Sequence, residues 1–177
     1  VFDVTLDCED GAPVGGEIEH AHLVQEIAIN TAPEARVAVR VHPVDHASFL
    51  SDVQIIVGSA HHKLRHVMIP KVESVADVET AVNALHQVGA AQLPLHVLIE
   101  SPAAVHRAFE IAAHPRVQSL SFGLMDFVSA HGGAIPSSGM GVSGQFTHPL
   151  VVRAKLEIAS ACHAHGKVPS HCVVTEF

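Results

Sequence analysis

The sequence predicts an α/β protein built on a parallel β-sheet, more specifically part of a (β/α)8 TIM barrel. Short apolar, β-branched segments alternate along the chain with longer segments of helical character. Strands that are apolar throughout are typical of parallel sheets, because helices cover both of their faces. Polar residues follow nearly every apolar segment, and a TIM barrel places its active site at that end of its strands. An open α/β sheet is the structural alternative.

The expected strands are short apolar segments bounded by loop residues. Eight strand and helix units take roughly 250 residues, whereas this chain has 177 residues. We therefore expect residues 1–177 to form a single domain, the central part of a barrel that lacks at least one unit before Val1 and one or more after Phe177. The expected strands cover residues 3–6, 37–41, 66–72, 95–99, 119–122 and 169–174.

Helices are expected between most of these strands, and their ends carry recognisable signals. Ser74 has an acidic residue three positions later, as in a capping box, and Gly89 follows the same segment. Pro102 precedes another helical segment, while the last one begins at a capping Thr147 and stops at Gly166. The expected helices cover residues 17–29, 74–89, 103–113 and 147–165.

Composition excludes several classes of partner. The formal net charge is −8, and no basic stripe with interleaved aromatic residues could follow a phosphate backbone, so nucleic acid is not expected. No segment approaches the roughly 18 apolar residues of a membrane span, and the first residues do not resemble a secretory signal. We expect a cytoplasmic protein without a membrane partner.

Cysteine and histidine do not indicate a metal site by themselves. The three cysteines, Cys8, Cys162 and Cys172, include no CxxC pair, so we expect them to be reduced and mostly buried. Some of the 16 histidines occur in close pairs that lack a carboxylate motif such as HExxH, which favours solvated surface side chains. These pairs are His20/His22, His61/His62 and His163/His165.

Two carboxylates, Glu100 and Asp126, follow consecutive predicted strands. On a parallel sheet they would stand at the same edge and could share one Mg²⁺, an ion that typically takes only one or two protein carboxylates. Alternatively, each acid could stabilise the N-terminus of the helix that follows. Spacing alone does not decide between these two interpretations.

Two basic residues also stand at strand ends. Arg40 lies within a strand that we expect to be buried, so its guanidinium needs an anion. That anion could be a substrate carboxylate or an internal partner among Asp7, Glu9 and Asp10, and both can hold when no substrate is bound. Lys71 could extend along its strand, but nearby acids disfavour a Schiff-base role.

The glycine-rich segment 132–144 is the only long stretch expected to be flexible. Its residues Gly139–Gly144 spell GMGVSG, which matches the dinucleotide pattern GxGxxG. A true fingerprint opens directly after a strand, whereas this one follows a long intervening segment. Ser143 does not lie in a GxSxG nucleophile elbow either. We interpret these glycines as loop residues.

Five short motifs at the strand ends form a recognisable set. They are LDCEDGA at 6–12, VRVH at 39–42, PKVES at 70–74, IES at 99–101 and FGLMD at 122–126. In type and order they resemble the HpcH/HpaI aldolase and citrate lyase beta-like family, which includes malyl-CoA and citramalyl-CoA lyases. One departure is His42, since an Asn often occupies this position, two residues after the family's Arg.

The resemblance implies a (β/α)8 barrel in a homo-oligomer, a trimer or hexamer, with Mg²⁺ bound by Glu100 and Asp126. It also implies that Arg40 holds the carboxylate of an α-keto acid, while Glu9 and Asp10 orient the substrate or serve the reaction. Backbone amides of the FGLMD turn are expected to assist. These belong to Gly123, Leu124 and Met125.

The implied function is a magnesium-dependent carbon-carbon lyase. It would cleave or form a 3-hydroxyacyl-CoA, such as malyl-, citramalyl- or citryl-CoA, giving a keto acid and an acyl-CoA. The alternatives are a class II aldolase that acts on a free 4-hydroxy-2-keto acid, and a family member that binds a metabolite without catalysis.

Overall fold

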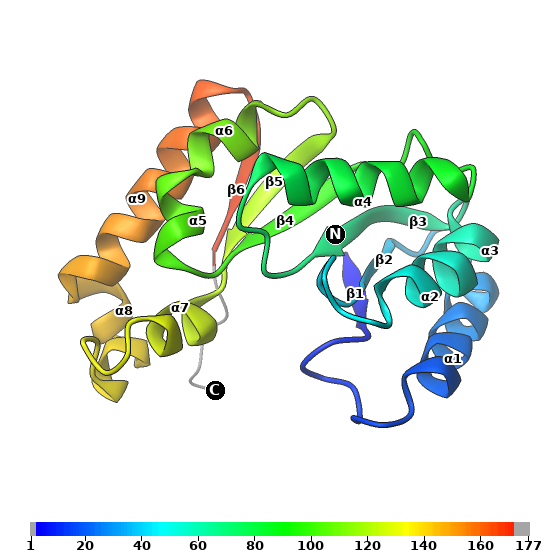
Figure 1. The fold of residues 1–177 in the computed structure, drawn as a ribbon, viewed down its shortest axis with the longest axis horizontal. Helices are drawn as coiled ribbons and strands as arrows, with labels where there is room; N and C mark the ends of the chain where they lie inside the picture. The colour runs from blue at the N-terminus through cyan, green and yellow to red at the C-terminus, as the bar shows by residue number, and fades with distance from the viewer. Residues whose placement is uncertain (1–2, 172–177) are drawn as a thin grey trace. The chain divides into compact units, whose positions relative to one another are not determined.

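The computed structural model describes residues 3–171 and contains an α/β fold. Six strands form one sheet in chain order, and the pairs β1–β2, β2–β3 and β5–β6 are parallel. Helices alternate with these strands (Figure 1). The strands are β1 (Val4–Asp7), β2 (Val37–Arg40), β3 (Leu64–Ile69), β4 (Leu95–Ile99), β5 (Val117–Phe122) and β6 (Val168–Ser170). The predicted strand 169–174 extends past residue 171, and that part lies outside the described residues.

The chain divides into two compact units. The first comprises Val1–Pro70 and Ala76–His96, and the second comprises Lys71–Val75 and Val97–Phe177. The single domain expected over residues 1–177 stays a prediction.

The first unit contains β1 to β3 and a layer of helices. Helix α1 (Glu17–Asn30) contacts α2 (Phe49–Asp52), the π-helical turn η1 (Val53–Val57) and α3 (Gly58–Ala60), as Figure 1 shows. The remaining helix, α4 (Val75–Gln87), lies within the expected segment 74–89.

The helical segment from α2 to α3 was not predicted from the sequence. Its run Val53–Val57 is rich in β-branched residues, which favour strands over helices. Burial decides the outcome here, because Val53, Ile56 and Val57 are all fully buried and η1 packs against α1. Tertiary packing thus overrides local propensity.

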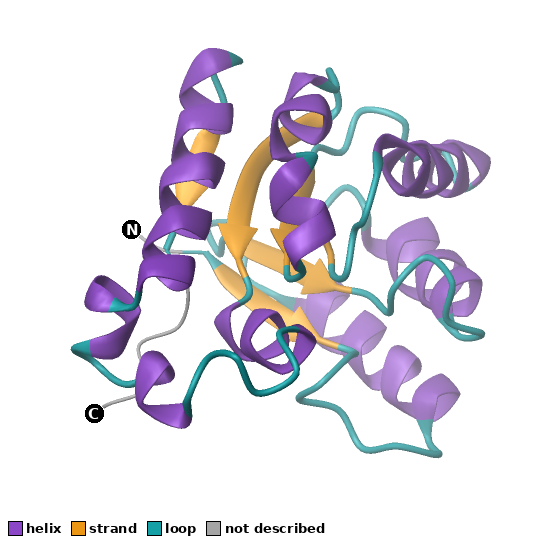
Figure 2. Ribbon diagram, turned by 60° about the vertical axis from the view of Figure 1, so that its left-hand side comes forward, coloured by secondary structure: helices purple, strands orange, loops and turns teal. Residues whose placement is uncertain are grey.

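The second unit contains β5, β6 and a helical layer that Figure 2 shows in front of the strands. Helix α9 (Pro149–Ala164) contacts β5, β6 and α6 (Ala108–Ala113). Two of the expected helices, 103–113 and 147–165, are interrupted. The helical elements of this unit are α5 (Pro102–His106), α6 (Ala108–Ala113), α7 (Leu124–Ala130), the 3₁₀ turn η2 (Ser137–Met140), α8 (Gly144–Thr147) and α9 (Pro149–Ala164).

Both interruptions have local causes. Arg107 leaves the helical conformation, with φ −97° and ψ 8°, and so separates α5 from α6. Thr147 does not cap the last helix, because its hydroxyl donates to Ser143 O at 2.9 Å within α8. His148 precedes α9 instead, and Pro149 occupies the first turn.

The glycine-rich segment serves close packing. A Cβ on Gly144 would overlap Ser138 O and lie 2.7 Å from Gly139 Cα, while a Cβ on Gly139 would lie 2.7 Å from Ile135 Cγ2. These glycines therefore allow parts of the loop to approach each other.

Cysteine and histidine exposure largely follows expectation. Cys8 and Cys162 are buried free thiols, and Cys172 lies outside the described residues. Members of the close histidine pairs are exposed or half-buried. No sequence pattern predicted which histidines are buried, and these include His42, His66, His96 and His114. No helix within residues 3–171 is long and apolar enough to cross a bilayer.

Two of these buried histidines are expected to make the folded protein less stable at acidic pH. The rings of His66 on β3 and His96 on β4 lie 5.4 Å apart. Burial lowers the pKa of both, and that of His96 reaches about 4. The unfolded chain therefore binds these protons first, and stability falls as the pH drops below about 6.5.

We expect the free energy of unfolding to fall by up to about 2 kcal/mol through His96 alone between pH 7.5 and pH 5. Urea unfolding at both pH values measures this loss, and His96→Leu should reduce it. An equal pH dependence in His96→Leu and the parent protein would contradict the assignment. His62→Gln, a change at an exposed position, is the control.

Candidate functional site

The first cluster of charged residues forms at the carboxyl ends of β1 and β2. Asp7 and Arg40 are paired in the register of the two parallel strands. Arg40 Nε lies 2.6 Å from Asp7 Oδ1, and a terminal guanidinium nitrogen lies 2.5 Å from Oδ2. This two-point geometry orients the guanidinium strongly.

A turn after β1 brings two further acids to Arg40. Asp7 carboxylate oxygens accept from the N–H of Glu9 at 3.0 Å and of Gly11 at 2.8 Å, which folds the chain back. Glu9 Oε2 then lies 3.0 Å from the guanidinium, and Asp10 Oδ2 lies 3.8 Å from it. The internal partner foreseen for Arg40 is therefore present, and it consists of all three acids.

The opposite charges in this cluster shift the pKa values of Asp7 and Arg40 toward their charged forms. Burial acts to raise the pKa of Asp7, but the hydrogen bonds from Arg40 and the Glu9 N–H outweigh it and hold that pKa below its ordinary value. Burial likewise acts to lower the pKa of Arg40, whereas Asp7, followed by Glu9 and Asp10, raises it above its ordinary value. Asp7 and Arg40 therefore both favour their charged forms.

We expect Arg40→Met to lower the free energy of unfolding by about 3 kcal/mol, because it leaves partly buried carboxylates without their counter-ion. The Glu9 side chain is only 6% exposed, so water cannot replace the guanidinium there. Urea unfolding at pH 7 measures the change. Arg36→Met is the matched control, since Arg36 also pairs with an aspartate, Asp3, but is 42% exposed. A similar loss in both variants would contradict this account.

The second cluster surrounds Glu100, directly after β4. Its side chain is buried, and Oε2 accepts from the backbone N–H of Lys71 at 2.7 Å. Lys71 has a φ of 52°, a left-handed conformation that is uncommon for a residue other than glycine. Strain of this kind tends to occur at functional sites.

Gly123 provides the space for the Glu100 carboxylate. A Cβ at position 123 would overlap Oε1 and lie 2.7 Å from Cδ of Glu100. Asp126 stands three residues further on, half-buried in the first turn of α7. Local chain geometry thus puts both predicted acids at the carboxyl ends of β4 and β5.

The helix-capping alternative fails for Glu100. Ser101 is the residue that caps α5, because its hydroxyl accepts from the N–H of Ala104 at 3.0 Å. For Asp126 the helix-stabilising interpretation stands, because the dipole of α7 also favours an acid in its first turn. Glu100 is held instead by the N–H of Lys71.

Mg²⁺ fits this donor set. Glu100 and Asp126 offer hard carboxylate oxygens, and Oε1 of Glu100 faces the gap left by the missing Cβ of Gly123. Within residues 3–171 no three His, Cys, Asp or Glu side chains gather as a metal cluster. A site with two protein ligands suits Mg²⁺, which keeps several waters, better than a metal that needs three or four protein ligands.

The backbone amides of the FGLMD turn differ in availability. The N–H of Gly123 donates to Ile99 O at 2.9 Å and so belongs to the strand pairing. Leu124 and Met125 open α7, where the first N–H groups of a helix have no partner within it. A substrate role for these amides stays a prediction.

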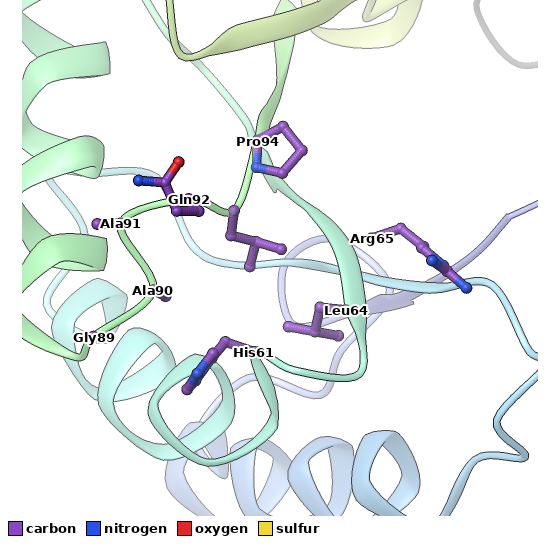
Figure 3. A pocket seen from close by; sticks show the side chains of 9 residues that line it. His61, Leu64, Arg65, Gly89, Ala90, Ala91, Gln92 and Pro94 are labelled. Carbon is purple, nitrogen blue, oxygen red and sulfur yellow. The ribbon is translucent and has the colours of Figure 1, made fainter.

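A separate cavity of about 330 Å³ lies at the other ends of β3 and β4 (Figure 3). Its lining includes Leu64 and Arg65, where β3 begins, and the loop from Gly89 to Pro94 that precedes β4. In barrels the amino ends of the strands contribute stability and the carboxyl ends carry the chemistry. This cavity is therefore not the predicted site.

The parallel strands and the helices that alternate with them define an α/β protein of the barrel class. Comparison with known proteins specifies the class. Residues 4–174 match the model of the HpcH/HpaI aldolase/citrate lyase family, and the chain belongs to this family.

Among its relatives is an L-malyl-CoA/beta-methylmalyl-CoA lyase of Cereibacter sphaeroides, 31% identical over 94% of this chain and 57% of that protein. A crystal structure of a citrate lyase from Burkholderia xenovorans LB400 is 49% identical, with a TM-score of 0.90, over 99% of this chain and 57% of that one. The chain thus spans little more than half the length of these proteins. The likeness supports the predicted barrel-type fold.

A third relative is the citrate lyase beta subunit of Mycobacterium tuberculosis, whose structure contains oxaloacetate and magnesium. It is 25% identical to this chain, with a TM-score of 0.77, over 98% of this chain and 69% of that one.

Proposed function

We propose that this protein is a magnesium-dependent carbon-carbon lyase that cleaves or forms a 3-hydroxyacyl-CoA. The buried Glu100 carboxylate carries the proposal, because it faces Gly123 and caps no helix. The similarity to a malyl-CoA lyase supports a thioester substrate, and the magnesium and oxaloacetate in the mycobacterial relative support the metal and a keto-acid product.

Glu100 and Asp126 would hold the metal. When bound, Mg²⁺ would act as a Lewis acid that stabilises negative charge on the oxygens of the hydroxy or keto acid. The Lys71 N–H fixes one oxygen of Glu100, so this carboxylate is already oriented before a ligand arrives. Asp126 gains its orientation from the first turn of α7.

Arg40 would bind the carboxylate of the substrate. Its guanidinium is held by Asp7 and Glu9, so its orientation is fixed before a substrate arrives. Glu9 and Asp10 are the acids for which we keep an orienting or catalytic role.

The reaction we propose breaks the bond between the α and β carbons of the thioester. A base takes the proton of the β-hydroxyl group, and the electron pair left on oxygen forms the carbonyl of the keto acid. The electrons of the broken carbon-carbon bond leave as the thioester enolate. Protonation of that enolate gives the acyl-CoA. Condensation is the same sequence reversed.

The test is direct. Purified full-length protein is incubated with malyl-CoA, citramalyl-CoA and citryl-CoA, and separately with free 4-hydroxy-2-keto acids, each with Mg²⁺ or with EDTA. We expect a keto acid and an acyl-CoA from at least one thioester, only when Mg²⁺ is present. Cleavage of the free acids alone would favour a class II aldolase, and binding without product would favour a non-catalytic family member.

Homo-oligomerisation and a cytoplasmic location belong to the same proposal. Size-exclusion chromatography with light scattering measures the oligomeric state, for which we expect a trimer or hexamer.

A further inference from the structure

The residue that holds Glu100 has an unusual backbone. Lys71 adopts a φ of 52°, and within residues 3–171 it is the one residue other than glycine with a positive φ. A Cβ makes this left-handed conformation unfavourable, so it persists only where the surrounding structure holds it. The turn at Lys71 therefore has a cost that a contact made by this backbone must offset.

The Lys71 backbone contacts the proposed metal ligand directly. Its N–H donates to Oε2 of Glu100 at 2.7 Å. Glu100 is 7% exposed, so water competes little for this oxygen. A hydrogen bond from a backbone N–H to a carboxylate is charge-assisted and stronger than one between neutral groups. Both residues belong to the second compact unit, which also contains Gly123 and Asp126. The left-handed turn thus places one N–H firmly against one of the two carboxylate oxygens.

Gly123 lies against the same side chain. A Cβ at position 123 would overlap Oε1 and Cγ of Glu100 and would lie 2.7 Å from Cδ. The atoms of Glu100 from Cγ to Oε1 therefore pass close to the Gly123 backbone, which limits rotation of the carboxylate. The two oxygens of Glu100 are thus not equivalent, because Oε2 accepts from Lys71 and Oε1 lies beside Gly123.

This difference between the two oxygens affects the choice of cation. Ca²⁺ is bound by about six to eight oxygens and often takes both oxygens of one carboxylate. Mg²⁺ needs near-ideal octahedral geometry and keeps several waters, so one oxygen from each carboxylate serves it. A bidentate contact with Glu100 would have to share Oε2 with the Lys71 N–H, whose positive end repels a cation. A carboxylate held in this way therefore favours the smaller ion.

We infer that the backbone of Lys71 positions Glu100 so that it offers one oxygen to the metal, which makes the site selective for Mg²⁺ over Ca²⁺. The inference rests on the proposed function, because it needs Glu100 as a metal ligand. Lys71 acts through Glu100, and its N–H is the group that does so. Selectivity serves the proposed reaction, because a smaller cation polarises the oxygens that it binds more strongly.

Calorimetric titrations of the purified full-length protein with Mg²⁺ alone and with Ca²⁺ alone test the inference. The sharpest variant replaces the peptide bond before Lys71 with an ester, which removes the N–H and leaves the side chain in place. We expect the ratio of the Ca²⁺ to the Mg²⁺ dissociation constant to fall at least about tenfold, because a hydrogen bond to a charged group is lost.

An ester before Ala103 is the matched control for this variant. Ala103 also follows a proline, and it lies in the first turn of α5, where N–H groups have no partner within the helix. The ratio of the two dissociation constants should therefore stay within about threefold of the parent value. An equal fall with the ester at either position would contradict a specific role of the Lys71 N–H.

A second pair of variants tests the conformation of residue 71. Lys71→Gly and Lys71→Val both remove the lysine side chain and keep the N–H, but only glycine adopts a φ of 52° at low cost. We expect Lys71→Gly to keep the ratio within about threefold of the parent value, and Lys71→Val to lower it at least about tenfold. Circular dichroism verifies folding, and the ester variant decides if Lys71→Val does not fold.

Thioester cleavage is assayed in parallel, so that two kinds of failure can be told apart. The inference fails and the proposed function stands if the parent protein cleaves a thioester with Mg²⁺ but binds Ca²⁺ equally well, or if the ester before Lys71 leaves the ratio unchanged. If the parent protein neither binds Mg²⁺ nor cleaves any of the thioesters, the proposed function and the inference fail together.

Discussion

Glu100→Gln and Asp126→Asn are each expected to lower magnesium-dependent turnover at least about a thousandfold, which corresponds to roughly 4 kcal/mol of lost transition-state stabilisation. Both changes keep the size of the side chain and remove only its charge. The amide oxygen of Gln at position 100 can still accept the N–H of Lys71, so the fold should persist. What is lost is a hard anionic ligand for the ion.

Turnover is measured with saturating thioester over a range of Mg²⁺ concentrations, and Mg²⁺ binding is measured by calorimetry. Glu110→Gln is the control, because Glu110 is an exposed acid on α6 in the same unit. Loss of Mg²⁺ binding together with unchanged thermal stability would support the ligand role. If either acid variant bound Mg²⁺ and turned over like Glu110→Gln, that acid would not be a ligand.

Much of the fold follows from simple sequence patterns. Strand β4 occupies the predicted residues 95–99, and α1 occupies 17–30 against a prediction of 17–29. The apolar residues of these elements follow the pattern typical of a buried strand or of an amphipathic helix, and residues at their ends signal the boundaries. In residues 49–60 the local sequence and the final structure disagree. Their β-branched run favours a strand, whereas they pack against α1 as a helix.

The candidate site was predictable to the extent that its chemistry lies in single residues. Arg40 and Glu100 attract attention because charges rarely adjoin buried strands without a reason. The left-handed turn at Lys71 leaves no such signal, since lysine rarely adopts this conformation and only the structure shows its N–H at Glu100. The metal role of Glu100 and Asp126 stays a prediction.

Gly123 shows how a residue without a side chain can shape a site. It has φ −89° and ψ 91°, a conformation open to any residue, so backbone strain does not require glycine there. The requirement is steric, because a Cβ would occupy the space of the Glu100 carboxylate. We therefore expect Gly123→Ala to force Glu100 to rotate and to break its 2.7 Å hydrogen bond with Lys71 N.

The expected result for Gly123→Ala is an Mg²⁺ affinity about a hundredfold weaker, or roughly 2.7 kcal/mol, and a free energy of unfolding lower by about 1–3 kcal/mol. Calorimetry measures the first quantity and urea unfolding the second. Gly141→Ala is the matched control in the same unit, since the nearest atom to its Cβ, Ser138 O, would be 3.5 Å away.

A double-mutant cycle separates displacement of the ligand from general damage. If Gly123→Ala acts only by moving the Glu100 carboxylate, it should cost almost no further Mg²⁺ affinity in a protein that already carries Glu100→Gln, so the two effects should be strongly non-additive. Additive losses would instead mean that Gly123→Ala disturbs α7 and Asp126. Because Gly123 stands directly before α7, that outcome would transfer the main role in metal binding from the β4 end to the helix.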